Sequence, residues 1–259
     1  MSPSTWNPEQ YLQFADARTR PAAELLARVE LASPQSVADL GCGPGNSTEL
    51  LARRWPATRI LGVDSSREML DAARKAHPEW RWELADIAAW TPQGPVDLIF
   101  ANAALHWLPD HGELLPRLLD QLAPGGVLAA QMPRNFDAPA HRLIRRAAEE
   151  GPWRDRLGGL QAWHPPMDPE AYYGILAPHA RRVDIWETEY LQVMEGPERI
   201  VEWAKGTALL PYLERLDGAE RDAFLARYAD AVAEAFPRQA DGRVLFPFKR
   251  IFFVAERQP

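Results

Sequence analysis

The sequence predicts an α/β protein: a doubly wound, mostly parallel seven-stranded sheet with an antiparallel last strand, an N-terminal helical cap and a helical insertion before the last strand. Three observations predict this class. Short apolar runs alternate with helical stretches as far as Met132, which is typical of parallel strands joined by crossover helices. Clustered glycines directly follow the first apolar run. Beyond Met132 helical patterns dominate, and the two remaining strand patterns flank a helical segment.

The N-terminal stretch predicts helices ahead of the first strand. Pro8 favours one helix start, and a second helix is expected over Pro21–Val29. Tyr11, Phe14 and Arg18 are three and four residues apart, so they share one helical face. This aromatic and basic face has two interpretations, a packing surface or a cap over a bound ligand.

The stretch 37–48 predicts a strand, a tight turn and a helix start. Val37–Leu40 is a short apolar strand, three glycines fall within the next five residues, and a helix opens at Asn46 or Ser47. Glycine permits a positive φ and lets a ligand press directly on the backbone. The helix that follows points its unpaired N–H groups toward that ligand. The stretch is therefore a candidate nucleotide site.

The glycine spacing and the residue before it predict the ligand. The spacing is G-x-G-x-G, whereas a pyrophosphate site carries G-x-G-x-x-G, and Asn46 stands where the third glycine of that pattern would be. Asp39 ends the strand, where a carboxylate repels a pyrophosphate and attracts an amine. These residues resemble the first motif of the S-adenosylmethionine-dependent methyltransferases of Rossmann-like fold. The resemblance implies a ligand with an α-amino group and no phosphate.

The second strand, Arg59–Asp64, predicts a ribose contact. A carboxylate at this end of the strand can accept hydrogen bonds from both ribose hydroxyls, and Asp64 occupies that position. The alternative role is the N-cap of the next helix, which Ser65 or Ser66 could also fill. Met69 lies either beneath an adenine or in the core.

The third strand, Trp80–Leu84, precedes an acidic and an apolar residue. In the resembled family an acidic residue here accepts a hydrogen bond from the adenine amino group, and the next apolar side chain packs on the ring. Asp86 and Ile87 match these by position and type. The alternative for Asp86 is an exposed turn residue.

The fourth strand, Val96–Ala101, is nearly all apolar, as expected of a parallel strand covered on both faces. It delivers residues 102–107 to its carboxyl end, outside which ligands bind in open α/β sheets. Many amino-group methyltransferases carry Asp/Asn-Pro-Pro-aromatic here, and Asn102-Ala-Ala-Leu departs from that pattern. His106 and Trp107 are either structural or face an anionic substrate, and they are the candidate catalytic residues, through positioning alone.

The remaining elements follow in order. Helices are expected over 47–54, 67–77, 114–122, 138–150 and 170–176, with two or three more over 197–236. A fifth strand over 125–132 follows a Pro-Gly-Gly turn, and late strands over 182–193 and 244–255 should pair as an antiparallel edge, with the insertion folded over the site. We expect one domain over 1–259. Its parts are a cap over 1–31, a cofactor-binding core over 32–135, and a C-terminal half over 136–259 with lid segments near 138–178 and 197–240.

The expected cofactor contacts lie at the carboxyl ends of these strands; they are Asp39, Gly41, Gly43, Gly45, Asn46, Asp64, Ser65, Met69, Asp86, Ile87, Asn102 and Ala103.

The composition of the chain argues against several classes of binding partner. The net charge of −7 provides no basic field for nucleic acid or an anionic membrane. Cys42 is the only cysteine, so no intrachain disulfide forms. No apolar run approaches the roughly 20 residues of a membrane span, and no signal pattern opens the chain. We expect a soluble, cytoplasmic protein without a metal site.

Five stretches resemble the family of trans-aconitate methyltransferases, and the resemblance covers nearly the whole chain; they are residues 6–22, 100–111, 131–133, 183–186 and 201–211. The resemblance implies methyl transfer from S-adenosylmethionine to one carboxylate of trans-aconitate, with S-adenosylhomocysteine as the other product. A carboxylate is already ionised at neutral pH, so this chemistry requires no general base. The absence of an obvious base constellation fits it.

A tricarboxylate substrate requires cationic or hydrogen-bonding residues that hold two carboxylates while the third reacts. The candidates are Tyr11, Arg18, Arg20, His106, Arg134, Asn135, Tyr172, Tyr173, Trp203 and Lys205. Any of them could instead be a solvated surface charge or lid packing. Three other functions stay open: carbon methylation of a quinone or sterol precursor, nicotinamide-dependent oxidoreduction, and cofactor sensing without catalysis. The acidic surface weighs against the apolar acceptor of the first function, and Asp39 and Asp86 weigh against the nicotinamide cofactor of the second.

Overall fold

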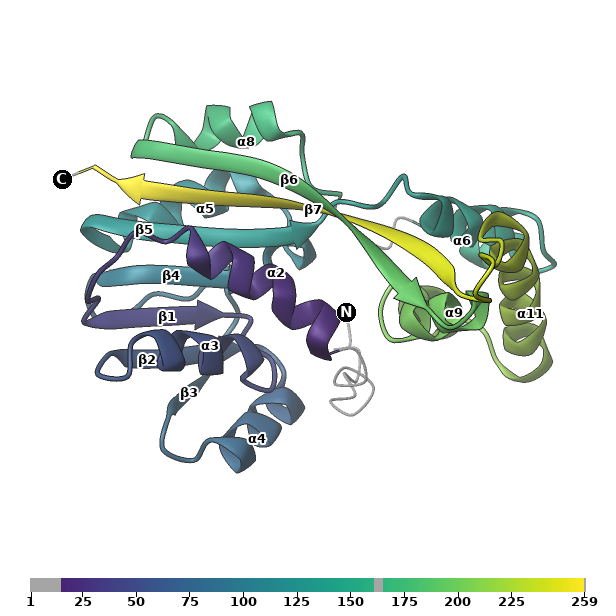
Figure 1. Ribbon diagram of the computed structural model, residues 1–259, viewed down its shortest axis with the longest axis horizontal. Coiled ribbons are helices and arrows are strands. Elements are labelled where there is room, and N and C mark those ends of the chain that lie inside the picture. The colour runs from purple at the N-terminus through teal and green to yellow at the C-terminus, as the bar shows by residue number, and fades with distance from the viewer. Residues whose placement is uncertain (1–14, 161–164, 259) are drawn as a thin grey trace. The chain divides into compact units, whose positions relative to one another are not determined.

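The structure, a computed structural model, describes residues 15–160 and 165–258. A seven-stranded sheet organises it, with strand order β3-β2-β1-β4-β5-β7-β6 (Figure 1). Pairs β1–β2, β2–β3, β1–β4 and β4–β5 are parallel, and β7 runs antiparallel to its neighbours. The predicted fold class is confirmed.

The strands are β1 (Ser36–Leu40), β2 (Arg59–Asp64), β3 (Arg81–Leu84), β4 (Val96–Asn102), β5 (Leu122–Pro133), β6 (Ala180–Met194) and β7 (Val244–Arg257). The helices are α2 (Ala15–Ala27), α3 (Asn46–Arg54), α4 (Arg67–Ala76), the 3₁₀ turn η1 (Leu105–Trp107), α5 (His111–Asp120), α6 (Pro139–Glu149), α7 (Arg154–Leu157), α8 (Pro169–Leu176), α9 (Pro197–Lys205), α10 (Leu210–Leu213) and α11 (Gly218–Ala235).

The sequence misplaced several boundaries. The described part of α2 contains Pro21 in its interior, so Pro21 does not begin a separate helix. Its fixed φ suits the helix, and the cost is one missing backbone hydrogen bond. Helix α5 begins at His111 rather than Leu114, and α7 lies within a stretch predicted to be a loop. The predicted turn before β5 belongs to the strand. The pairing with β4 shifts there and Gly125 has φ 73°, so the proline and glycines form a bulge.

Two compact units divide the chain. One takes in the described residues of 1–133, 166–187 and 251–259, and the other takes in those of 134–165 and 188–250. This division groups α8 with the unit that carries the glycine turn, whereas the sequence-based scheme extended the first lid segment to residue 178.

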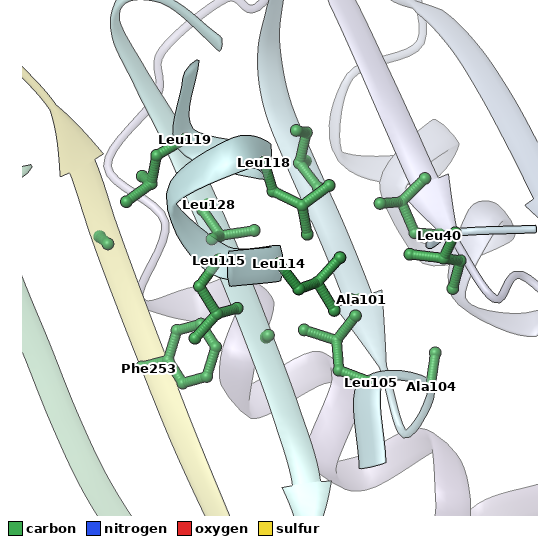
Figure 2. Close-up of a cluster of buried hydrophobic side chains, with 14 of the residues drawn as sticks. Leu40, Ala101, Ala104, Leu105, Leu114, Leu115, Leu118, Leu119, Leu128 and Phe253 are labelled. Atoms are coloured by element: carbon green, nitrogen blue, oxygen red, sulfur yellow. The ribbon is translucent and has the colours of Figure 1, made fainter. Parts of the chain in front are cut away.

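The first unit has a leucine-rich core between α5 and the sheet. Leu114, Leu115 and Leu118 recur at helical spacing, and α5 packs against β5 and α8. Figure 2 shows these leucines directed at Leu128 on β5 and at the strand that bears Ala101. Directly after α2, the Arg28 guanidinium lies 5.3 Å from the Trp186 ring centroid and 3.5 Å from Asp184.

The second unit is a helical layer with an aromatic core. Helix α11 packs against α6 and α9. The Trp153 indole donates a hydrogen bond to the carbonyl of Ala147 at 2.8 Å, and its ring meets the edge of Phe224 at 5.3 Å. Tyr212 stacks on the same phenylalanine at 6.1 Å. No described helix is long and apolar enough to cross a bilayer.

The buried face of α5 is a test of the core. Leu118→Ala should lower the free energy of unfolding by about 2–5 kcal/mol, because a fully buried leucine leaves a cavity that the packed sheet cannot close. Urea unfolding followed by circular dichroism measures the change. Leu191→Ala, at a residue that is 58% exposed, is the control and should change stability by less than about 0.5 kcal/mol. Equal effects of the two variants would contradict this packing.

Candidate active site

The glycine turn lies between β1 and α3 in a backbone conformation that glycine permits. Gly41, Gly43 and Gly45 have φ of 71°, 55° and 99°. The N–H of Gly41 donates to the carbonyl of Val63 at 2.7 Å, so the turn is fixed to the neighbouring strand β2. A Cβ at Gly43 would meet no atom within 4 Å, which leaves room above that residue for a ligand.

Gly41 has a further constraint, because the turn after β4 lies directly against it. A Cβ at Gly41 would overlap the Cβ of Ala104 and would lie 3.6 Å from the Cδ1 of Ile87. Three segments predicted to contact the cofactor therefore meet here, following β1, β3 and β4. Asp86 and Ile87 follow β3; Asp86 is exposed and accepts a hydrogen bond from the N–H of Ala88 at 2.9 Å.

Asp39 lies beneath the turn and is fully buried. Its Oδ2 accepts hydrogen bonds from the hydroxyls of Ser47 at 2.8 Å and Thr48 at 2.6 Å, both in the first turn of α3. Its Oδ1 has no hydrogen-bond partner among the described residues. Burial raises the pKa of Asp39 to about 6; the two hydroxyls oppose this and the charge of Asp64 adds to it. Sequence reasoning missed Ser47 and Thr48, although hydroxyls in a helix's first turn are a readable signal.

Asp64 ends β2 on the other side of the turn. Its Oδ2 accepts from the N–H of Gly43 and its Oδ1 from the N–H of Ser66, each at 2.8 Å. Ser66, not Asp64, is the N-cap of α4, since its hydroxyl accepts from the N–H of Met69. Burial raises the pKa of Asp64, and the backbone N–H groups oppose this. Ser65 is exposed, and Met69 is buried in the core.

The turn after β4 has a defined but unusual backbone. Ala103 has φ 54°, and its N–H donates to the carbonyl of Gln131 on β5 at 2.9 Å. The side-chain amide of Gln131 donates to the Oδ1 of Asn102. His106 is buried with its ring centroid 4.8 Å from that of Trp107, which is 38% exposed. Hydrogen bonds of Asn102 and Ala103 with Gln131 thus tie the start of the turn after β4 to β5.

The candidate substrate contacts do not all gather at one place. Tyr11 and the side chain of Arg18 lie outside the described residues. Arg20 pairs with Glu24 on the surface of α2, and Tyr173 is 57% exposed. Tyr172 is fully buried in the core of the first unit, where its hydroxyl contacts His111, so it is not placed as an open substrate contact.

The other candidates belong to the second unit. Lys205 pairs with Glu202 at 2.7 Å, and Trp203 packs against Phe246 and Phe248. Asn135 is 4% exposed, and its Nδ2 has no hydrogen-bond partner among the described residues.

A buried arginine that sequence analysis did not select lies in this same unit. Arg250 is 3% exposed on β7, with its guanidinium 4.7 Å from the ring centroid of Phe248. The N–H of Arg134 donates to the carbonyl of the adjacent Lys249 at 2.8 Å. The period of two in β7 was the available signal, because it places Arg250 on the same face as Phe246 and Phe248. In the described ranges no group of three or more His, Cys, Asp or Glu side chains could hold a metal ion.

Comparisons with known proteins show which family the chain resembles. Residues 37–126 match the model of a methyltransferase domain family. The trans-aconitate 2-methyltransferase of Azoarcus sp. (strain BH72) is 56% identical over 98% of this chain and 99% of its own length. The enzyme of the same name from Methylobacterium nodulans is 54% identical over 97% of this chain and 98% of its own length.

Solved structures share the fold at low sequence identity. The YcgJ protein from Bacillus subtilis superposes with a TM-score of 0.61 at 14% identity, covering 93% of this chain and 99% of that one. A phosphoethanolamine N-methyltransferase 2 from Haemonchus contortus, solved with S-adenosylhomocysteine, gives 0.56 at 16% identity over 93% of this chain and 53% of that one. These likenesses show the fold alone.

The raised pKa of Asp39 makes stability depend on pH. The folded-state pKa of about 6 lies above the ordinary 3.8, so the native protein binds this proton more tightly than the unfolded chain does. Raising the pH from about 4 to about 7 should therefore destabilise the wild type relative to Asp39→Asn by about 2 kcal/mol. Urea unfolding of both proteins across this range gives the difference. A difference that stays constant with pH would contradict the buried, titrating carboxyl.

Proposed function

Because the chain belongs to the trans-aconitate 2-methyltransferase family, we propose that it transfers a methyl group from S-adenosylmethionine to a carboxylate of trans-aconitate, giving the monomethyl ester and S-adenosylhomocysteine. The observation that carries the proposal is identity of 49–56% over at least 96% of this chain to relatives of that name. We retain the cytoplasm as the proposed location and a small tricarboxylate as the partner.

The residues around the glycine turn fit a nucleoside that carries an amine. The buried Oδ1 of Asp39, without a partner in the described ranges, is an acceptor close beneath the turn. An anionic carboxylate there disfavours a phosphate and favours a cation. Backbone N–H groups of Gly43, Ser65 and Ser66 face the Asp64 carboxylate, which has about four acceptor sites, so it can also accept from a ribose hydroxyl. Ile87 would pack on the adenine, beside Gly41.

The proposed chemistry asks little acid–base work of the chain. Bound S-adenosylmethionine supplies an electrophilic methyl group on a sulfonium. The acceptor is a carboxylate oxygen that is ionised at neutral pH, so no side chain has to remove a proton. The task left to the protein is to hold the acceptor in line and to exclude water, which strengthens the attraction between the opposite charges. The ordered turn of residues 102–107 is suited to the first task.

We propose that Arg134, Asn135 and Arg250, all in the second unit, recognise carboxylates of the substrate. A guanidinium presents a planar fork of N–H donors that matches a carboxylate. The N–H bond from Arg134 to Lys249 fixes the segment after β5 beside β7, near Arg250. Arg250 is buried, and the buried Nδ2 of Asn135 has no hydrogen-bond partner among the described residues. Both observations support polar contacts to a ligand rather than solvation at the surface.

The acceptor is tested by product analysis. Purified protein with S-adenosylmethionine should form S-adenosylhomocysteine and a monomethyl ester when trans-aconitate is supplied, and neither without an acceptor. Mass spectrometry of the ester and a coupled assay for S-adenosylhomocysteine measure the reaction. Citrate, cis-aconitate, fumarate and an apolar quinone precursor complete the panel. Absence of turnover with every tri- and dicarboxylate, or turnover only with the quinone, would overturn the proposal.

Asp64 tests the nucleoside site. Asp64→Asn keeps the shape but removes the charge that strengthens hydrogen bonds from ribose hydroxyls. S-adenosylhomocysteine should therefore bind about 10–100-fold more weakly, as measured by isothermal titration calorimetry. Asp71→Asn is the matched control, because Asp71 lies on the exposed side of α4 and pairs with Arg74. A loss no larger than the control's, or NAD binding in preference to S-adenosylhomocysteine, would exclude this site.

A further inference from the structure

Two buried residues, His111 and Tyr172, hold the turn that follows β4. His111 is the first residue of α5, and Tyr172 lies on α8, 61 positions later. The imidazole Nε2 lies 2.8 Å from the carbonyl oxygen of Leu105, and Nδ1 lies 2.8 Å from the Tyr172 hydroxyl. The Leu105 carbonyl belongs to η1, so the pair joins α8 to the turn after β4 within one compact unit.

The chemistry of these groups fixes the direction of both hydrogen bonds. A carbonyl oxygen can only accept, so Nε2 of His111 carries the hydrogen and donates it to Leu105. In a neutral imidazole Nδ1 is then the acceptor, and the Tyr172 hydroxyl donates to it. Tyr172 also packs on Phe253 of β7, with ring centroids 5.6 Å apart. The Leu105 carbonyl thus selects the Nε2–H tautomer of His111, and the Tyr172 hydroxyl stabilises that tautomer by donating to Nδ1.

The turn needs such support because its backbone is unfavourable at both ends. Ala103 has φ 54° and Asp110 has φ 55°, and neither is a glycine. Residues with a Cβ rarely adopt this left-handed conformation, and they keep it only where the surrounding structure fixes it. The His111–Leu105 bond closes the segment 105–111, which contains Asp110 and begins two residues after Ala103.

The position of this turn bears directly on the site. Ala104 lies against Gly41, and His106 and Trp107 follow it two and three positions later. Where catalysis rests on in-line positioning, a displacement of about 1 Å can cost about 100-fold in rate. Without the hydrogen bond between His111 and Tyr172, the turn could move relative to the glycine loop even if the two side chains stayed buried.

We propose that His111 and Tyr172 are positioning residues for methyl transfer: the Tyr172 hydroxyl holds the His111 imidazole in the orientation in which it donates to Leu105 and fixes the Leu105–Trp107 turn against the glycine loop. The inference rests on the proposed function for its kinetic part. It replaces the expectation that Tyr172 touches substrate. Neither side chain needs to contact the acceptor or the sulfonium, because both act through the backbone of Leu105.

Tyr172→Phe is the first test, since it removes one hydroxyl and keeps the ring that packs on Phe253. We expect kcat to fall about tenfold or more, with the KM for trans-aconitate and the affinity for S-adenosylhomocysteine within about threefold of wild type. A second pair of variants varies the histidine. Glutamine has a donor and an acceptor on one carboxamide, so His111→Gln should retain more activity than His111→Leu, which has neither.

Tyr228→Phe is the matched control. Its hydroxyl is buried and lacks a hydrogen-bond partner among the described residues, and it lies on α11 in the other unit. The control should leave kcat unchanged. All rates are measured well below the Tm of every variant, so that a general loss of stability does not enter them.

Nuclear magnetic resonance provides a readout that does not depend on turnover. In the free protein the ¹⁵N signals of His111 should report the Nε2–H tautomer, and the Trp107 indole signal should shift in Tyr172→Phe but not in Tyr228→Phe. An Nδ1–H tautomer, or an unmoved Trp107 signal, would overturn the proposal even if the acceptor were a different compound. So would a lowered Tm in Tyr172→Phe and His111→Leu with kcat unchanged, which is the result of a purely structural role. Wild-type inactivity on the acceptor panel would instead overturn the proposed function.

Discussion

The close approach of Gly41 and Ala104 is the constraint on which the rest of the site depends. Strands β1 and β4 are parallel neighbours, with Asp39 paired in register with Phe100. Their following turns therefore emerge side by side, and there is no space for a side chain between them. This is the point in an open parallel sheet where crossovers leave in opposite directions and a ligand crevice forms. Glycine at position 41 is needed both for its positive φ and for this contact.

Two carboxylates give the crevice its chemical character. Asp39 is held by hydroxyls from α3, and Asp64 is held by backbone N–H groups of the glycine turn and of the start of α4. Burial raises the pKa of both, which means that their negative charges are costly in the free protein. A ligand that brings a positive charge or hydroxyl donors offsets this cost, and a pyrophosphate would add to it. The same two residues thus build the turn and carry the charge that we propose selects its ligand.

The second unit contributes features of a different kind. Its core is aromatic, with Trp153 and Tyr212 both in contact with Phe224. Two of its arginines are Arg134, directly after β5, and the buried Arg250 on β7. Arg250 shows how such a residue is overlooked. A lone arginine in an apolar strand is usually interpreted as an edge or surface residue. Only the alternation of buried positions along β7 places Arg250 on the same buried face as Phe246 and Phe248.

The mostly parallel seven-stranded sheet with its antiparallel last strand, the residues at the ends of β1 and β2, and the glycine turn could be predicted from the sequence alone, because they follow from local rules of periodicity, backbone freedom and charge. Pro124, Gly125 and Gly126 were misplaced because a bulge requires a partner strand. Tyr172 was assigned to the substrate because an amphipathic ring is compatible with either place, and its contact with His111 joins residues 61 positions apart. The sequence therefore determined the kind of ligand that the β1 turn accepts. The side chains that hold the turn after β4 emerge from the packing of α5 and α8, since no local rule specifies a hydrogen bond between separate helices.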